Sequence, residues 1–222
     1  MPVTEPPPPD PEGTTMLKIW GRANSANVMK PLWACDEMGV AYEHEEVGGA
    51  FGRTRDPGYL SMNPNSRVPT IDDDGFVLWE SNAIVRYLAD KHGRGSMAPA
   101  DPRDHADADR WMDWQQTTVL PVMTPIFWGL VRTPAAERKP DVIETARKEG
   151  IGVWGILDAR LAGRDYVMGD RLTMADIPLG PQCHRWMVLI EDRPEMPNLE
   201  AWYQRLLARP AFRKWCGVTP LT

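Results

Sequence analysis

The sequence predicts a small α/β domain followed by an all-helical domain. Short apolar segments alternate with helical patterns up to residue 92, whereas the stretches after residue 103 read as long helices without strand signals. A length of 222 residues fits one large core or two small ones. A hydrophobic content of 42% beside 25% charged residues is enough for a packed core and argues against a disordered chain.

The first domain opens with a strand, a helix and a second strand. Residues 16–20 are a short apolar strand, and residues 26–38 are predicted as a helix that ends at Gly39. Residues 40–47 alternate between apolar and polar side chains, which favours a second strand. A glycine-rich loop, residues 48–58, follows it.

The rest of this domain is predicted as a helical turn, a hairpin and a helix. The helical turn lies near Tyr59, and residues 63–66 form a turn signal. Residues 67–71 and 76–80 flank three aspartates and a glycine, which is suitable turn chemistry for two antiparallel strands. Ser81 then begins a helix with its apolar residues on one side. The predicted order is strand, helix, strand, helix, strand, strand, helix.

Proline content and helical patterning predict the boundaries of a leader, two domains and a linker. Residues 1–15 contain six prolines and almost nothing apolar, which predicts a disordered or polyproline-like leader. The first domain then covers residues 16–92, a linker covers residues 93–103, and the all-helical domain covers residues 104–222. Its helices are expected at approximately 104–132, 140–162, 173–190 and 198–209.

Charge and cysteine usage exclude several classes of function. With 25 Lys and Arg against 31 Asp and Glu the net charge is −6, so no partner in nucleic acid or an anionic membrane is expected. Cys35, Cys183 and Cys216 are far apart and odd in number, which argues against a disulfide framework or a thiolate zinc site. The uncharged residues 114–131 contain two prolines and predict a buried, kinked helix rather than a membrane span. Without an apolar secretory segment, a cytoplasmic location is predicted.

No metal site is predicted. His44, His92, His105 and His184 are isolated from one another and lack ligand spacing. The aspartates at positions 72–74 could suggest a cation site, but a hairpin turn explains them more economically.

Residues 24–30 are the first of three segments that suit a binding site. Ser25 and Asn27 stand at the start of a helix, where unpaired backbone N–H groups attract an anion and lower the pKa of a thiol. No histidine or carboxylate neighbours Ser25 in the sequence, so its hydroxyl is expected to donate a hydrogen bond to another molecule's sulfur. The alternative is that both residues only cap the helix.

The other two segments could bind the backbone of a peptide ligand and its charged end groups. In Arg67-Val68-Pro69 a proline opens a strand, a cis peptide is possible, and the backbone of Val68 is free for an extended ligand. At the strand-to-helix junction Glu80-Ser81, the hydroxyl and nearby N–H groups can hold a carboxylate while Glu80 pairs with an ammonium group. Each segment alone also has a structural explanation, a strand start or a helix cap.

Two stretches of the chain resemble the cytosolic glutathione S-transferase family. LKIWGRANSANVMKPLWACDEMG is similar to the beginning of its N-terminal domain, and NPNSRVPTIDDDGFVLWESNAIVRYLADKHG is similar to the end of that domain. The likeness covers nearly everything from Met16 onward and is nearest to bacterial members with a theta-like or nu-like Ser/Asn pattern. It implies a thioredoxin-like domain that binds glutathione as a substrate, an all-α domain that covers an electrophile pocket, and a homodimer used in detoxification.

The resemblance implies a role for the residues at the thiol. Ser25 resembles the serine that contacts the thiol in theta-type members, and Asn27 matches an asparagine of bacterial disulfide-reductase-type relatives. Pro31, a few residues into the helix, removes one hydrogen bond and could loosen this turn. Which of the two residues dominates thiol activation therefore stays open. The early tyrosine and cysteine of other classes are missing, which argues against glutaredoxin-like chemistry through an enzyme thiol.

The resemblance also assigns the remainder of glutathione. Val68 beside a cis Pro69 would contact the cysteinyl backbone, and Arg67 would lie near the glycyl carboxylate. The γ-glutamyl end would be held by Glu80 with Ser81.

Expectations for the second domain rest on three motifs. Asp109 is similar to an acid that reaches glutathione in the partner subunit of some classes, and Trp114 is favoured among several aromatic and threonine side chains for the electrophile pocket. Thr173 and Asp176 have the spacing of a capping box and resemble a folding motif of this family. Phe51, on the glycine-rich loop, could insert into a partner subunit or shield its own loop.

The predicted function is a glutathione transferase, in which the thiolate of bound glutathione attacks a small hydrophobic electrophile or a mixed disulfide. The sequence pattern is equally compatible with disulfide or peroxide reduction by glutathione. The alternative is a non-catalytic module of the same fold that binds ligands or other proteins. A dithiol reductase is disfavoured because the chain has no Cys-x-x-Cys pair.

Overall fold

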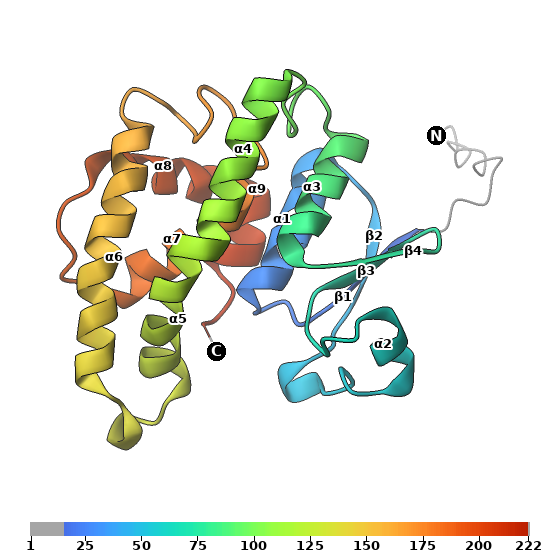
Figure 1. Cartoon of the computed structure of the whole chain (residues 1–222), viewed down its shortest axis with the longest axis horizontal. Coiled ribbons are helices and arrows are strands. Elements are labelled where there is room, and N and C mark those ends of the chain that lie inside the picture. The colour runs from blue at the N-terminus through green and yellow to red at the C-terminus, as the bar shows by residue number, and fades with distance from the viewer. Residues whose placement is uncertain (1–15, 222) are drawn as a thin grey trace, which may run out of the picture.

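The computed structural model describes residues 16–221, so the predicted leader, residues 1–15, lies outside the described part. Figure 1 shows a small sheet with its helices beside a larger group of helices. The predicted fold class, an α/β domain followed by an all-helical domain, is confirmed. Within residues 16–221, none of the helices combines the length and the apolar character needed to cross a lipid bilayer.

The sheet contains β1 (Leu17–Trp20), β2 (Tyr42–Glu45), β3 (Thr70–Asp73) and β4 (Phe76–Trp79). Their order across the sheet is β2-β1-β3-β4. β1 is parallel to β2, which requires a crossover, and antiparallel to β3, while β3 and β4 form the expected hairpin. The central strands therefore carry the apolar core of this domain.

Two helices bury this sheet, α1 (Ala26–Met38) and α3 (Ser81–His92), and the short α2 (Pro57–Met62) follows the glycine-rich loop. The core between the sheet and the two helices is formed by Leu17, Ile19, Val28, Leu32, Ile71, Ile84 and Leu88. The helix α1 ends where the sequence predicted, because Gly39 adopts a φ of 69° that glycine tolerates without steric penalty.

The helical domain contains α4 (Pro102–Trp114), α5 (Leu120–Phe127), α6 (Pro140–Leu161), α7 (Asp176–Leu189) and α8 (Pro197–Ala208). All four predicted helical stretches are present, with ends shifted by up to three residues. The sequence missed the short α9 (Pro210–Phe212), which packs back against α1.

The stretch predicted as one helix at 104–132 is helical throughout but contains two π-helical turns, Gln115–Val119 and Trp128–Arg132. In the first, the N–H of Leu120 donates to the carbonyl of Gln115, five residues earlier. Prolines inside this stretch lack the N–H of a regular α-helix. A π turn holds more residues than an α turn, so it changes which side chains face the first domain.

The start of α7 contains one of the two hydrogen bonds of the predicted capping box, between Thr173 and Asp176. The carboxylate of Asp176 accepts hydrogen bonds from the Thr173 N–H at 3.0 Å and from the Trp202 indole N–H at 2.9 Å. The carboxylate is fully buried, and burial raises the pKa of Asp176 to about 6. Because the Val167 N–H also donates to this carboxylate at 3.0 Å, Asp176 joins three segments of the helical domain in addition to its capping bond with Thr173.

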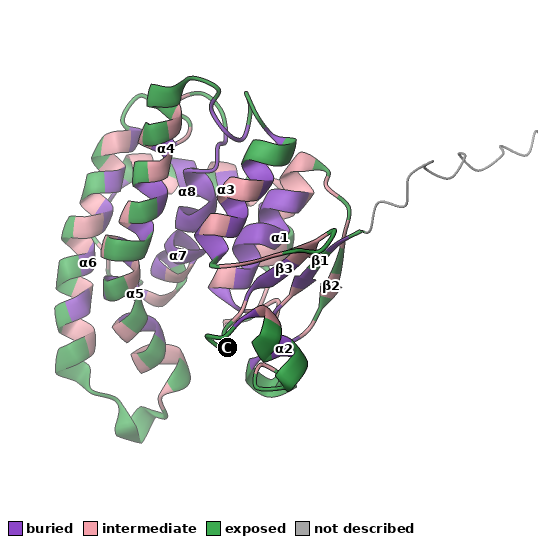
Figure 2. Cartoon of the chain, turned by 45° about the vertical axis from the view of Figure 1, so that its right-hand side comes forward, coloured by how far each residue is buried: buried purple, intermediate pink, exposed green. Residues whose placement is uncertain are grey.

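Helix α1 is packed on both of its sides. Trp33 is fully buried and meets the edge of the Phe212 ring at a centroid distance of 4.8 Å. A Cβ at Gly180 of α7 would lie only 2.7 Å from the Trp33 ring, so a glycine allows the two helices to approach. Figure 2 shows buried residues concentrated where α1, α3, α7 and α8 come together. This packing fixes the N-terminus of α1 between the two domains.

Candidate functional site

A cleft of about 520 Å³ lies where the two domains meet. Its sheet-domain wall consists of Arg22, Ser25, Ala26, Asn27, Gly48, Gly49, Thr54, Ser66, Arg67 and Val68. Its helical wall consists of Leu120, Met123, Thr124, Phe127, Trp128, Arg132, Gln182 and Arg185. The cleft thus brings together four residues that the sequence selected: Ser25, Asn27, Arg67 and Val68.

Ser25 occupies the N-cap position of α1, but its side chain makes no capping hydrogen bond. Its backbone carbonyl instead accepts hydrogen bonds from the N–H groups of Val28 and Met29. The first N–H groups of a helix have no partners within the helix and carry its positive dipole end. Ser25 is therefore a hydroxyl on the cleft wall, beside a helix start that favours an anion.

A buried lysine, which the sequence analysis missed, lies behind this helix start. Lys30 has 0% of its surface exposed, and its Nζ donates to Ser81 Oγ at 3.1 Å, to Asn82 Oδ1 at 2.9 Å and to Gln115 Oε1 at 3.1 Å. Burial lowers the pKa of Lys30 to about 7, although the charge of Glu80 opposes this shift. A lone lysine among the apolar residues of α1 was the available signal for this site.

The Lys30 ammonium group orders the side chains between itself and the cleft. Because Lys30 donates to the Ser81 oxygen, the Ser81 hydroxyl proton is available to another acceptor, and Asn27 Oδ1 lies 3.5 Å away. With its oxygen turned to Ser81, Asn27 directs its amide N–H groups elsewhere. Asn27 lines the cleft, so these donors are available to a ligand there.

The segment before β3 is fixed by two side chains that the sequence analysis did not select as site residues. The carbonyl of Arg67 accepts hydrogen bonds from the Tyr59 hydroxyl at 2.7 Å and from the Asn63 amide at 2.9 Å. Both side chains also bond to Thr70 Oγ1 at the start of β3. These bonds hold Val68 on the cleft wall, and the Val68–Pro69 peptide is cis.

The remaining predicted residues do not line the cleft. Glu80 is exposed at the N-cap of α3 with a φ of 74°, an unusual conformation for a residue with a side chain, and Ser81 is buried behind Asn27. Asp109 lies on α4, where its carboxylate accepts from Arg86 Nε at 2.7 Å. The pairing with Arg86 holds Asp109 outside the cleft.

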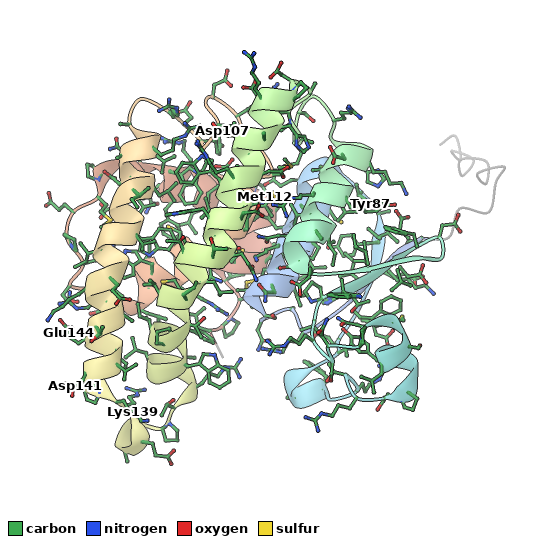
Figure 3. The ribbon with its side chains drawn as sticks, viewed as in Figure 1. Tyr87, Asp107, Met112, Lys139, Asp141 and Glu144 are labelled. Atoms are coloured by element: carbon green, nitrogen blue, oxygen red, sulfur yellow. The ribbon has the colours of Figure 1, made fainter. Side chains whose placement is uncertain are left out.

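Trp114, expected in the electrophile pocket, does not line this cleft. It packs edge-on against Trp111 at a centroid distance of 5.1 Å and against the helical core. Aromatic side chains reach the cleft only after the first π turn, at Phe127 and Trp128. Before this π turn, α4 is bonded to the first domain: the carbonyl of Met112 accepts a hydrogen bond from the Asn82 amide at 2.8 Å. Figure 3 shows Met112 where α4 faces α3.

The cysteines are not sources of a reactive thiolate. Cys35, Cys183 and Cys216 are free and buried. Burial raises the pKa of the Cys35 thiol to about 12, and raises the pKa of the other two thiols as well. In residues 16–221 no group of three His, Cys, Asp or Glu side chains is arranged to hold a metal ion. Any sulfur ionised in this cleft therefore belongs to a ligand.

Comparisons with known proteins agree with this arrangement. The family model for the glutathione S-transferase N-terminal domain matches residues 15–90, and that for the C-terminal domain matches residues 119–210. "Glutathione S-transferase GstB" of Escherichia coli K12 is 40% identical over 201 residues, which covers 90% of this chain and 97% of the relative. "Glutathione S-transferase F13" of Arabidopsis thaliana is 31% identical over 208 residues, covering 89% and 94% of the two chains.

A solved structure is similar over the whole fold. It is the theta class glutathione S-transferase of the citrus canker pathogen Xanthomonas axonopodis pv. citri with glutathione bound. The TM-score is 0.88 at 48% sequence identity, and the alignment covers 93% of this chain and 99% of that one.

Proposed function

Because the chain belongs to the glutathione S-transferase family, we propose that it is a transferase that binds glutathione in the cleft, ionises its thiol and transfers the sulfur to a small electrophile. The observation that carries this proposal is the Ser25 hydroxyl, which lies on the cleft wall at the start of α1 and does not cap the helix. The Xanthomonas relative with bound glutathione supports the choice of ligand.

The sheet-domain wall would hold the tripeptide. The backbone of Val68 pairs with the cysteinyl backbone, as an added strand would. Arg67 pairs with the glycyl carboxylate, and Ser81 with Glu80 holds the charged groups of the γ-glutamyl end. Lys30 already donates to the Ser81 oxygen, so the Ser81 hydroxyl proton would pass from Asn27 Oδ1 to this end of the ligand when glutathione binds.

Thiol activation would combine two favourable contacts to the sulfur. The Ser25 hydroxyl donates a hydrogen bond to the thiolate, and the N-terminus of α1 favours its negative charge. The thiol proton leaves to water, because no carboxylate or histidine lines the cleft. The thiolate then attacks the electrophilic carbon, a C–S bond forms, and the leaving group departs with the bonding electron pair. Asn27 is the second candidate donor to the sulfur, and the same contacts serve attack on a mixed disulfide.

We further infer a cytoplasmic homodimer with a role in detoxification. Asp109 does not line the cleft of the chain to which it belongs, so in that dimer it would contact the glutathione bound by the partner subunit. The exposed Phe51, with 52% of its surface accessible, supports a protein contact at the glycine-rich loop.

The test is an ultraviolet titration of the thiolate of bound glutathione. Loss of one charge-assisted hydrogen bond, worth about 1.5 to 3 kcal/mol, should raise the thiol pKa by about one to two units in Ser25→Ala. Asn27→Ala decides whether the asparagine shares this role. Ser61→Ala is the matched control, since Ser61 is exposed on α2 and donates to Gly58.

An unchanged titration in both Ser25→Ala and Asn27→Ala would contradict the assignment. A non-catalytic module is the second candidate function. Glutathione-affinity capture without turnover of any electrophile would favour that module over an enzyme.

A further inference from the structure

The cleft carries a strong excess of positive charge. Four arginines line it, and no aspartate or glutamate does. Arg67 has an assigned partner in the proposed function, the glycyl carboxylate. Arg22 on the loop after β1, Arg132 at the end of the second π turn, and Arg185 on α7 are left without one.

These three guanidinium groups form no ion pair within residues 16–221. None of the ion pairs in that part of the chain includes Arg22, Arg132 or Arg185, and the Nε atoms of Arg22 and Arg185 are buried without hydrogen-bond partners. The acid whose charge most affects Arg22 is Glu46, but its carboxylate accepts the Ala23 N–H at 3.1 Å. Burial, and then repulsion from Arg132 and Arg22, lowers the pKa of Arg185 to about 10.

A buried amide beside this cluster is also without partners. Gln182 lies one helical turn before Arg185 on α7, and only 1% of its surface is exposed. Neither its Oε1 nor its Nε2 has a hydrogen-bond partner, although it lines the cleft. A buried polar group left unpaired destabilises the protein, and a ligand with hydrogen-bonding oxygens would remove that penalty.

The surface around the arginines is aromatic. The guanidinium carbon of Arg185 lies 3.7 Å from the centroid of the Phe127 ring, and that of Arg132 lies 5.6 Å from the same ring. Trp128, with 59% of its surface exposed, continues the apolar wall toward the mouth of the cleft. A ligand that fits both features is an anion attached to an apolar, ring-sized body.

We propose that the second substrate of this transferase is an electrophile that carries a carboxylate on an aromatic or similarly apolar body. The proposal rests on the proposed function and names its substrate class. The carboxylate pairs with Arg185 and Arg132 and accepts the Gln182 amide N–H, because planar guanidinium groups match carboxylates in charge and shape. The apolar body lies against Phe127 and Trp128. In the transfer step the thiolate attacks the ring carbon that bears a halide, the C–S bond forms, and chloride leaves with the bonding pair while the carboxylate is unchanged.

The test compares two probes of nearly equal shape, 4-chloro-3,5-dinitrobenzoate and 4-chloro-3,5-dinitrobenzamide. Each kcat/KM is divided by the uncatalysed rate constant with glutathione, which removes the difference in intrinsic reactivity. One or two charge-assisted hydrogen bonds should make the enzyme favour the benzoate by about tenfold or more. Arg185→Met and Arg132→Met should each lower this preference by about tenfold.

The control variant is Arg213→Met, which removes the same charge from an exposed position outside the cleft and should keep the preference. Equal treatment of the two probes by the unmodified enzyme would overturn the proposal. It would also be overturned if Arg185→Met and Arg132→Met weakened glutathione binding in calorimetry and left the preference intact, because the arginines would then belong to glutathione.

Failure of the proposed function gives a different result. If neither probe reacts faster than without enzyme, calorimetry with the unreactive 3,5-dinitrobenzoate on glutathione-saturated protein still decides the inference. Binding that Arg185→Met weakens about tenfold supports the carboxylate site, and no heat of binding overturns it.

Discussion

The two walls of the cleft differ in whether their polar groups have partners in the protein. On the sheet-domain wall and directly behind it, the Lys30 ammonium group has three acceptors and the Arg67 carbonyl has two donors. On the helical wall, Gln182 and the Nε of Arg185 have none. Apart from the Arg22 Nε, which is also buried without a partner, the first wall is thus pre-organised, as is appropriate for a ligand of fixed structure, whereas the second wall keeps hydrogen-bonding capacity for a ligand.

This difference has an energetic consequence. A buried side chain that supplies hydrogen bonds to several buried partners supports the fold around it even where burial of its charge is costly, because its removal leaves those partners unsatisfied. A buried charge without a partner opposes folding, because its desolvation is not compensated. Substitution of one cation on each wall by an uncharged side chain of similar length should therefore change stability in opposite directions.

The largest effect is expected on the sheet-domain side, for Lys30→Met. The substitution leaves the oxygens of Ser81 and Asn82 without their buried donor, so the free energy of unfolding should fall by about 2 to 4 kcal/mol in urea denaturation. Lys139→Met is the control, because Lys139 is exposed at the end of the helical domain away from the sheet, as Figure 3 shows, and should change stability by less than about 0.5 kcal/mol. Equal stabilities of Lys30→Met and the unmodified protein would remove the proposed difference between the walls.

The lowered pKa of Lys30 predicts that the stability of the protein depends on pH. Its pKa is lowered in the fold to about 7 from an ordinary value of 10.5, so between these values the unfolded chain binds more protons than the folded one. The contribution of Lys30 to the free energy of unfolding should therefore rise as the pH rises from about 7 toward 10.5. Below pH 7 both states carry the charge and this contribution is constant. Urea denaturation at pH 7 and pH 9 should show a rise in the unmodified protein that is smaller in Lys30→Met, and parallel pH profiles would contradict the shift.

The same contrast between the walls explains how much could be predicted from the sequence. Ser25, Asn27, Arg67 and Val68 are close to helix starts, turns and strand ends, whose geometry is set by a few neighbouring residues. The strands and the helix that carry them were therefore predicted with ends correct to within a few residues.

The helical wall depends on long-range packing and could not be predicted in that way. The π turn at Gln115–Val119 breaks the regular helical spacing along this stretch, and the aromatic side chains in the cleft, Phe127 and Trp128, lie beyond it. Arg185 and Gln182 reach the cleft because Gly180 lets α7 approach α1. A glycine at position 180 does not by itself identify Trp33 of α1 as the side chain that it lets approach.

The smallest expected effect is on the helical wall and has the opposite sign. Arg185→Met removes a guanidinium group that is mostly buried beside two like charges, while the methionine sulfur can still contact the Phe127 ring. Removal of this unpaired buried charge should stabilise the protein, and loss of the Arg185–Phe127 contact should offset part of that stabilisation. The free energy of unfolding should therefore rise by about 0.5 to 1 kcal/mol. Arg185→Lys keeps the charge and should show no such rise in the same urea denaturation. A loss of stability in Arg185→Met would mean that this arginine supports the fold, and the two walls would then not differ in the way their hydrogen bonds indicate.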